Sequence, residues 1–166
     1  MLTATLLVCA MMALTGANED PSINSTSLII NRDESCPSNW KKFNDRCFNF
    51  VPRSLSWATA EKNCQSMDAN LASVHSIEEY HFIQSVIQDN TAQDQETWVG
   101  ASDCQEENVW LWSDGSVFKF SNWCQGQPDD TENRQRCLQI NYGDGKCWDD
   151  NGCSNLRPSI CARKAQ

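Results

Sequence analysis

The chain has 166 residues with 13 Lys or Arg against 22 Asp or Glu, a formal net charge of −9. This length accommodates one domain with short tails and is too short for a two-domain enzyme. An acidic chain repels nucleic-acid phosphates and anionic membrane surfaces, and its ten cysteines exclude a reducing cytosol as its expected compartment.

Residues 1–17 are predicted to be a secretory signal peptide. They hold no charged side chain, and an apolar run from Leu6 to Leu14 is followed by small residues before a cleavage point at Asn18. The alternative is a membrane anchor, but this run is too short to span a bilayer, and no later segment is long enough. We therefore expect a secreted, extracellular protein without membrane insertion.

Residues 18–35 are polar, lack hydrophobic periodicity and are predicted to be a flexible segment. Asn24 opens an Asn-Ser-Thr sequon, which makes it a candidate glycosylation site; the alternative is an unused triplet. Beyond this segment, Cys36 and Cys47 flank aromatic residues and the turn Asn44-Asp45. This pattern predicts a small hairpin closed at its ends by the two cysteines.

Two helices are predicted next. Ser56 can cap the first, where apolar residues recur at helical spacing: Trp57, Ala60, Cys64 and Met67. Ser76 and Glu79 have the spacing of a capping box at the start of the second. The apolar stripe of the second helix is expected to lie in the core; it contains Phe82, Ile83, Val86 and Ile87.

After about residue 95 the pattern changes to short strands separated by long segments rich in turn residues. The strand candidates are Thr97–Ala101, Val109–Trp112, Leu138–Ile140, Lys146–Trp148 and Ser159–Ala162. Helices followed by short strands indicate an α+β domain. Long loops without regular structure usually carry function, and disulfides can hold them in place.

Nine cysteines remain once Cys9 leaves with the signal peptide. An odd number in a secreted protein leaves one thiol, either free or in an intermolecular bridge. Zinc is the alternative explanation for clustered cysteines, but the chain has no Cys-x-x-Cys pair and its only histidines are His75 and His81. Neither histidine has a catalytic spacing, so we expect surface or capping roles for both.

Three short motifs follow one another along the chain: Trp98-Val99-Gly100, Gln127-Pro128-Asp129 and Trp148-Asp149-Asp150. In this order, together with the cysteines, they resemble the C-type lectin-like domain over residues 36–163. Within that family the chain is similar to small secreted fish lectins and type II antifreeze proteins. The resemblance implies the long form of the α+β fold, with two helices packed on short antiparallel strands and a disulfide-braced long-loop region.

The resemblance also implies disulfide pairs. The general pattern gives Cys36–Cys47, Cys64–Cys161 and Cys137–Cys153, and the fish antifreeze group adds Cys124–Cys147. Cys104 is left over, because Arg136 occupies the position of its partner in that group. We therefore expect a disulfide-linked homodimer through Cys104; the alternatives are a small-thiol cap, a buried free thiol or a different pairing.

A calcium site is implied by the same family. Ca²⁺ prefers a shell of oxygen ligands, and the implied metal ligands are Gln127, Asp129, Asp149 and Asp150. Gln135 stands where the family has an acidic ligand, and Glu132 in the same loop is a candidate substitute. The alternative is that these acidic residues are ordinary turn residues that bind no metal.

Sugar binding in the family shares these ligands, because two vicinal hydroxyls complete the calcium shell and hydrogen-bond to the side chains that hold the ion. The carbohydrate-binding candidates are therefore also Gln127, Asp129, Asp149 and Asp150. Gln-Pro-Asp goes with galactose-type sugars. Residues 130–136 contain no aromatic residue that could stack on a sugar, so we expect weak single-site affinity and a need for multivalency.

The predicted function is a secreted calcium-dependent lectin for galactose-type glycans, including sugars on microbial surfaces, with a role in innate recognition. The alternative is a type II antifreeze protein that binds ice. A hydrolase is not expected, since the chain has neither a Gly-x-Ser-x-Gly elbow nor a metalloprotease helix.

Overall fold

The computed structural model describes residues 35–166. The predicted signal peptide, the Asn24 sequon and residues 18–34 of the predicted flexible segment lie outside the described residues. Among residues 35–166, no helix is long and apolar enough to cross a membrane.

An eight-stranded sheet forms the framework, in the order β1-β2-β8-β4-β6-β7, with β3 paired to β8 and β5 paired to β4. The strands are β1 (Lys41–Phe43), β2 (Arg46–Leu55), β3 (Asn70–Leu71), β4 (Thr97–Ser102), β5 (Leu111–Trp112), β6 (Cys137–Tyr142), β7 (Cys147–Asn151) and β8 (Arg157–Lys164). All pairings are antiparallel except that of β4 with β8. The α+β prediction is confirmed.

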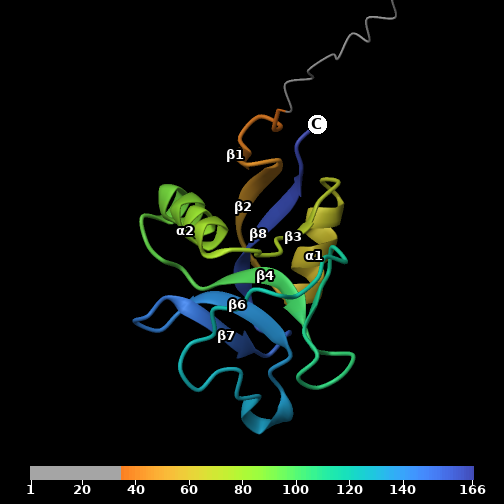
Figure 1. Ribbon diagram of the computed structural model, residues 1–166, viewed down its shortest axis with the longest axis vertical. Helices are drawn as coiled ribbons and strands as arrows, with labels where there is room; N and C mark the ends of the chain where they lie inside the picture. The colour runs from red at the N-terminus through yellow and green to blue at the C-terminus, as the bar shows by residue number, and fades with distance from the viewer. Residues whose placement is uncertain (1–34) are drawn as a thin grey trace, which may run out of the picture. The chain divides into compact units, whose positions relative to one another are not determined.

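Two helices cover the sheet: α1 (Trp57–Gln65) and α2 (Ile77–Thr91). Figure 1 shows them on either side of the β2–β8 pair, with β6, β7 and the long loops at the end away from the β1–β2 hairpin. The long loops therefore lie over the part of the sheet that carries the Trp148-Asp149-Asp150 motif.

The helix caps differ in detail from the sequence prediction. Ser56 is the N-cap residue of α1, but its hydroxyl donates to Thr59 Oγ1 (2.8 Å) and does not cap a backbone N–H. In α2 the Glu79 N–H donates to Ser76 Oγ (3.2 Å), as predicted. The reciprocal half of the capping box is shifted by one residue, because the Glu79 carboxylate accepts the His75 N–H (2.8 Å).

The apolar residues form two clusters. The larger one packs α2 against the sheet and the long loops through Ile83, Ile87, Val99, Ile140 and Trp148, all of which are fully buried. The smaller one packs α1 against the opposite face of β4, where Trp98 is fully buried. The predicted stripe of the second helix therefore lies in or against the core, as expected for an amphipathic helix.

Close packing around Gly100 explains why the Trp-Val-Gly motif has a glycine at this position. A Cβ at this position would lie 2.4 Å from the Leu71 carbonyl oxygen, closer than packed atoms can approach. The contact arises because β4 and β3 approach each other here, and the Gly100 N–H donates to the Ala72 carbonyl (2.9 Å). A larger residue would push these segments apart.

Four disulfides brace the fold, and their pairing is the one that the resemblance implies: Cys36–Cys47, Cys64–Cys161, Cys124–Cys147 and Cys137–Cys153. The first closes the β1–β2 hairpin, and the second ties α1 to β8. The third joins the segment before Gln127 to the start of β7, where the Cys124 N–H also donates to the Trp148 carbonyl (2.9 Å). The loop with the Gln-Pro-Asp triplet is thereby fixed to the strand with the two aspartates.

Candidate functional site

The Gln127-Pro128-Asp129 loop is held against β7 by the carboxylate of Asp150. The Gln127–Pro128 peptide bond is cis. Backbone N–H groups of Asp129 and Asp130 donate to Asp150 Oδ1 (3.0 Å) and Oδ2 (2.7 Å). Asp150 is fully buried, so its carboxylate anchors the loop in a place that excludes water.

A pocket of about 260 Å³ opens beside this loop. It is lined by Glu96, Gln127, Asp129, Thr131, Gln135, Gln139, Tyr142, Asp149, Asn151 and Arg157. Four of the predicted ligands, Gln127, Asp129, Gln135 and Asp149, thus meet in one place although they span 23 positions of the chain.

A polar network across the strands holds Asp149. Gln139 lies opposite Asp149 in the β6–β7 ladder, and its Nε2 donates to Asp149 Oδ2 (2.7 Å). The Gln139 Oε1 accepts from Asn151 Nδ2 (2.9 Å) and Arg157 Nε (3.1 Å). Arg157 also pairs with Glu96 (3.0 Å). Because each amide and guanidinium group has a partner, the Asp149 carboxylate is held in one orientation.

The surroundings shift the pKa values of the carboxylates that form the site. Burial raises the pKa of Asp149 to about 6, and the charges of Asp150, Asp129 and Glu96 also raise it, against the hydrogen bond from Gln139. Burial likewise raises the pKa of Asp150. Hydrogen bonds from Thr131 instead lower the pKa of the exposed Asp129. A cation in the pocket would favour the ionised form of both buried acids.

The donor atoms of the site are of the kind that calcium binds. Carboxylate and amide oxygens are hard ligands suited to Ca²⁺, and the buried Gln127 Oε1 has no hydrogen-bond partner. Within residues 35–166, however, no three carboxylates place an oxygen each within 4.8 Å of one another. In this arrangement a calcium shell would combine at most two closely spaced carboxylates with amide oxygens, and the unpartnered Oε1 of Gln127 is one such oxygen.

Glu132 and Gln135 take different positions. Glu132 is exposed, pairs with Arg134 (3.5 Å) and is not among the pocket-lining residues. Gln135 lines the pocket, but its Oε1 accepts the Thr131 N–H (2.9 Å). The structure therefore places Gln135 with the site and leaves Glu132 outside it.

Sequence reasoning missed several pocket residues, of which Tyr142 matters most. Tyr142 ends β6, is 37% exposed, and lines the pocket. It supplies an aromatic ring beside the triplet, although residues 130–136 have none. In the sequence, this residue is only a tyrosine at the end of a strand. The pairing of β6 with β7, which carries Asp149, is what places it at the pocket.

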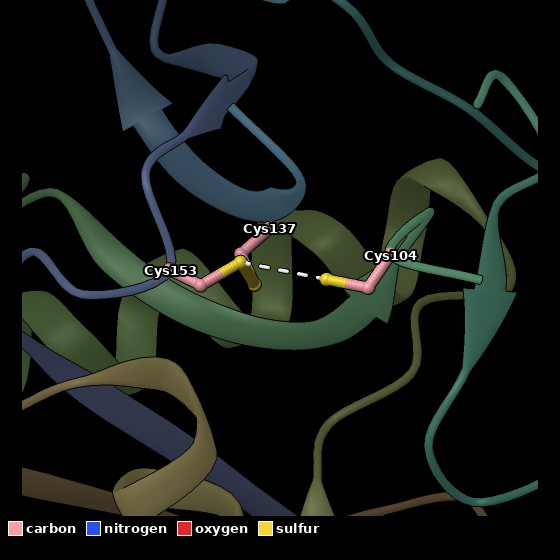
Figure 2. A group of neighbouring side chains, drawn as sticks. All are labelled: Cys104, Cys137 and Cys153. Atoms are coloured by element: carbon pink, nitrogen blue, oxygen red, sulfur yellow. Dashed lines mark hydrogen bonds between the residues drawn. A yellow bond between two sulfur atoms is a disulfide. The ribbon is translucent and has the colours of Figure 1, made fainter. Parts of the chain in front are cut away.

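Cys104 is the free cysteine among the described residues, and it is exposed. Figure 2 shows its side chain facing the Cys137–Cys153 disulfide, with 3.7 Å between the sulfurs of Cys104 and Cys153. Its thiol also donates to the Arg136 carbonyl oxygen (3.7 Å). The alternative of a buried free thiol is therefore wrong.

Comparison with known proteins gives the following matches. The sequence model of the family described as Lectin C-type domain matches residues 53–163. A type-2 ice-structuring protein of Osmerus mordax is 46% identical over 166 residues, covering 98% of this chain and 92% of that protein. Ladderlectin of Oncorhynchus mykiss is 39% identical over 182 residues (99% and 94%), and the galactose-specific lectin nattectin of Thalassophryne nattereri is 37% identical over 129 residues (78% and 80%). A solved Ca²⁺-dependent type II antifreeze protein, in its Ca²⁺-free form, is 43% identical with a TM-score of 0.73, covering 78% of this chain and all of that one.

Proposed function

The chain belongs to the C-type lectin domain family, whose members matched here are binding proteins and not enzymes, and we propose that it is a secreted calcium-dependent lectin for galactose-type sugars. The observation that carries the proposal is the meeting of Gln127 and Asp129 with Asp149 in one pocket. The similarity to a galactose-specific lectin supports the sugar class.

The residues of the proposed site bind the calcium ion, fix the binding loop and form hydrogen bonds with the sugar. In this proposal Gln127, Asp129 and Asp149 hold calcium. Asp150, predicted from the resemblance as a further ligand, is instead given the role of fixing the loop that carries the first two, because both of its carboxylate oxygens accept loop N–H groups. Bound calcium supplies a centre that two vicinal hydroxyls of a sugar can approach. The Gln127 amide then donates hydrogen bonds to those hydroxyls and the Asp129 carboxylate accepts them, which gives the order expected for galactose.

The specificity is tested by calorimetric titration with galactose and with mannose in millimolar calcium. Tighter binding of galactose is expected from the Gln-Pro-Asp order of the triplet. Tighter binding of mannose would contradict the assignment of the sugar class.

Tyr142 is proposed to stack on the apolar face of the sugar. Tyr142→Ala is expected to weaken galactose binding by about five- to tenfold, the effect of one aromatic contact, as measured by calorimetry. Tyr142→Phe is the matched control, because it keeps the ring and should bind like the wild type. If the alanine variant binds galactose as tightly as the wild type, the ring does not contact the sugar.

Secretion and covalent dimer formation complete the proposal. Four disulfides and an exposed thiol at Cys104 support an extracellular protein in which that thiol bonds to a second copy. A dimer raises the valency of a weak sugar site, which suits a role in the recognition of microbial surfaces.

Cys104→Ser should convert the secreted protein from a disulfide-linked dimer to a monomer on non-reducing electrophoresis, because no other free thiol lies among the described residues. Galactose binding per site should not change. A wild-type monomer, or peptide mapping that finds Cys104 bonded to Cys153, would contradict the covalent dimer.

Ice binding is a second candidate, favoured by the 46% identity to a type-2 ice-structuring protein. A freezing-hysteresis measurement of the purified protein tests it directly. Hysteresis without galactose binding would support the antifreeze function and reject the lectin. Galactose binding without hysteresis would support the lectin and reject ice binding.

A further inference from the structure

Arg136 lies directly before β6, at the end of the loop that carries the Gln-Pro-Asp triplet. Its guanidinium contacts three carboxylates, those of Asp130 (2.7 Å), Asp103 (3.4 Å) and Glu107 (3.7 Å). Building on the proposed function, we propose that Arg136 is a positioning residue whose fixed positive charge orders the sugar-binding loop before any ligand binds.

On one side, the guanidinium organises the segment after β4. Asp103 is buried, and its Oδ2 accepts the Asn108 N–H (2.8 Å) as well as the contact from Arg136. The Asp103 N–H donates to the Arg136 carbonyl (3.2 Å). None of the four disulfides joins residues 103–108 to the binding loop, and these polar contacts extend the connection beyond the last residue pair of β4 and β6.

On its other side, the guanidinium reaches the sugar pocket through Asp130. Asp130 Oδ1 accepts the Gln135 N–H (2.9 Å), and Oδ2 pairs with Arg136. The Asp130 N–H donates to Asp150 Oδ2 (2.7 Å). Asp130 therefore joins the guanidinium to the carboxylate that anchors the triplet, and its two neighbours in sequence, Asp129 and Thr131, both line the pocket.

Charge explains why an arginine is needed at this place. The Arg136 side chain is 24% exposed and that of Asp130 18%, so water screens their interaction only partly. Without the guanidinium, three carboxylates would face one another with no cation between them, and Asp103 would be buried with an unpaired charge. Repulsion would then favour open arrangements of the loop.

The test compares Arg136→Gln with Arg134→Gln. Arg134 lies in the same loop, but its side chain is exposed and pairs with Glu132, outside the pocket. Amide hydrogen exchange in ligand-free protein is measured at Asp129, Asp130 and Gln135, whose N–H groups donate to Asp150 and Asp130. Arg136→Gln should speed exchange at these amides by about tenfold and weaken galactose binding by a similar factor, whereas Arg134→Gln should change neither.

Salt separates positioning by charge from a general structural role. Raising the sodium chloride concentration should speed exchange of these amides in the wild type, because salt screens the ion pairs. In Arg136→Gln it should instead slow exchange, because salt screens the repulsion among the remaining carboxylates. Arg136→Lys keeps the positive charge but loses the planar set of N–H donors of the guanidinium group, so it should keep part of the protection against exchange. This variant replaces Arg136→Gln in the test if the glutamine variant does not fold.

Equal loop protection in Arg136→Gln and the wild type would overturn the inference, as would loop exchange that is insensitive to salt in the wild type. A wild type that binds no galactose but shows these exchange effects would leave the role of Arg136 intact and reject the proposed function.

Discussion

Replacing Asp149 with asparagine is expected to abolish both the calcium-induced rise in melting temperature and the binding of galactose. The asparagine side chain would keep an oxygen for the Gln139 amide (2.7 Å in the wild type) but would lose the charge that attracts the ion. Calcium at about 100-fold above its dissociation constant should stabilise the wild type by about 2.7 kcal/mol and the variant hardly at all. Scanning calorimetry with calcium and with EDTA measures the difference.

The same variant should be no less stable than the wild type in EDTA at neutral pH. Burial and three nearby acids raise the pKa of Asp149 from 3.8 to about 6, so the folded state favours the protonated acid. Its ionisation therefore lowers wild-type stability as the pH rises from about 4 to above 6, and asparagine removes this loss.

Glu132→Gln is the matched control, because it removes an acidic charge from the same region outside the pocket. It should keep the calcium response. A calcium response in Asp149→Asn equal to that of the wild type would exclude Asp149 as a ligand.

Trp148→Ala is expected to lower the free energy of unfolding by about 3–5 kcal/mol, as for other large aromatic residues removed from cores. Trp148 is fully buried, and its ring lies 5.5 to 6.0 Å from four aromatic rings, those of Trp112, Phe118, Phe120 and Trp123. Three of these come from residues 113–123, which contain no strand or helix of their own. Trp148 is therefore the ring that all three of these side chains contact.

Urea unfolding followed by far-ultraviolet circular dichroism measures the effect of Trp148→Ala. Val117→Ala is the control, since Val117 is 66% exposed and its truncation should change stability by no more than about 0.5 kcal/mol. A loss below about 1 kcal/mol for Trp148→Ala would mean that the long-loop region is not packed around it.

The predictable parts of the fold are those that depend on neighbours in sequence. The stripe of α2 and the Ser76 cap follow from helical spacing, and the hairpin of β1 and β2 follows from its turn. By contrast, β2 extends to Leu55 through the exposed Pro52, Arg53 and Ser54, which show no apolar alternation. These three residues lie in an irregularity of the pairing with β8, which resumes at Leu55, and a single sequence does not reveal that partner.

The candidate site was predictable in its residues but not in its arrangement. The motifs identify Gln127, Asp129, Asp149 and Asp150, because the family resemblance attaches to those positions. The role of Asp150 as the anchor of loop N–H groups, and the support of Asp149 by Gln139, depend on strand register and loop path. Tyr142 was missed for the same reason, since it joins the pocket through the pairing of β6 with β7.

Retention of the wild-type protein on immobilised galactose tests the central claim most directly. The column is loaded in millimolar calcium and then washed with EDTA, alongside a mannose column under the same conditions. We predict retention on galactose, release by EDTA because the pocket acids lose the ion that the sugar hydroxyls share, and passage through mannose. Passage through the galactose column in calcium, or retention that EDTA does not reverse, would contradict a calcium-dependent galactose lectin.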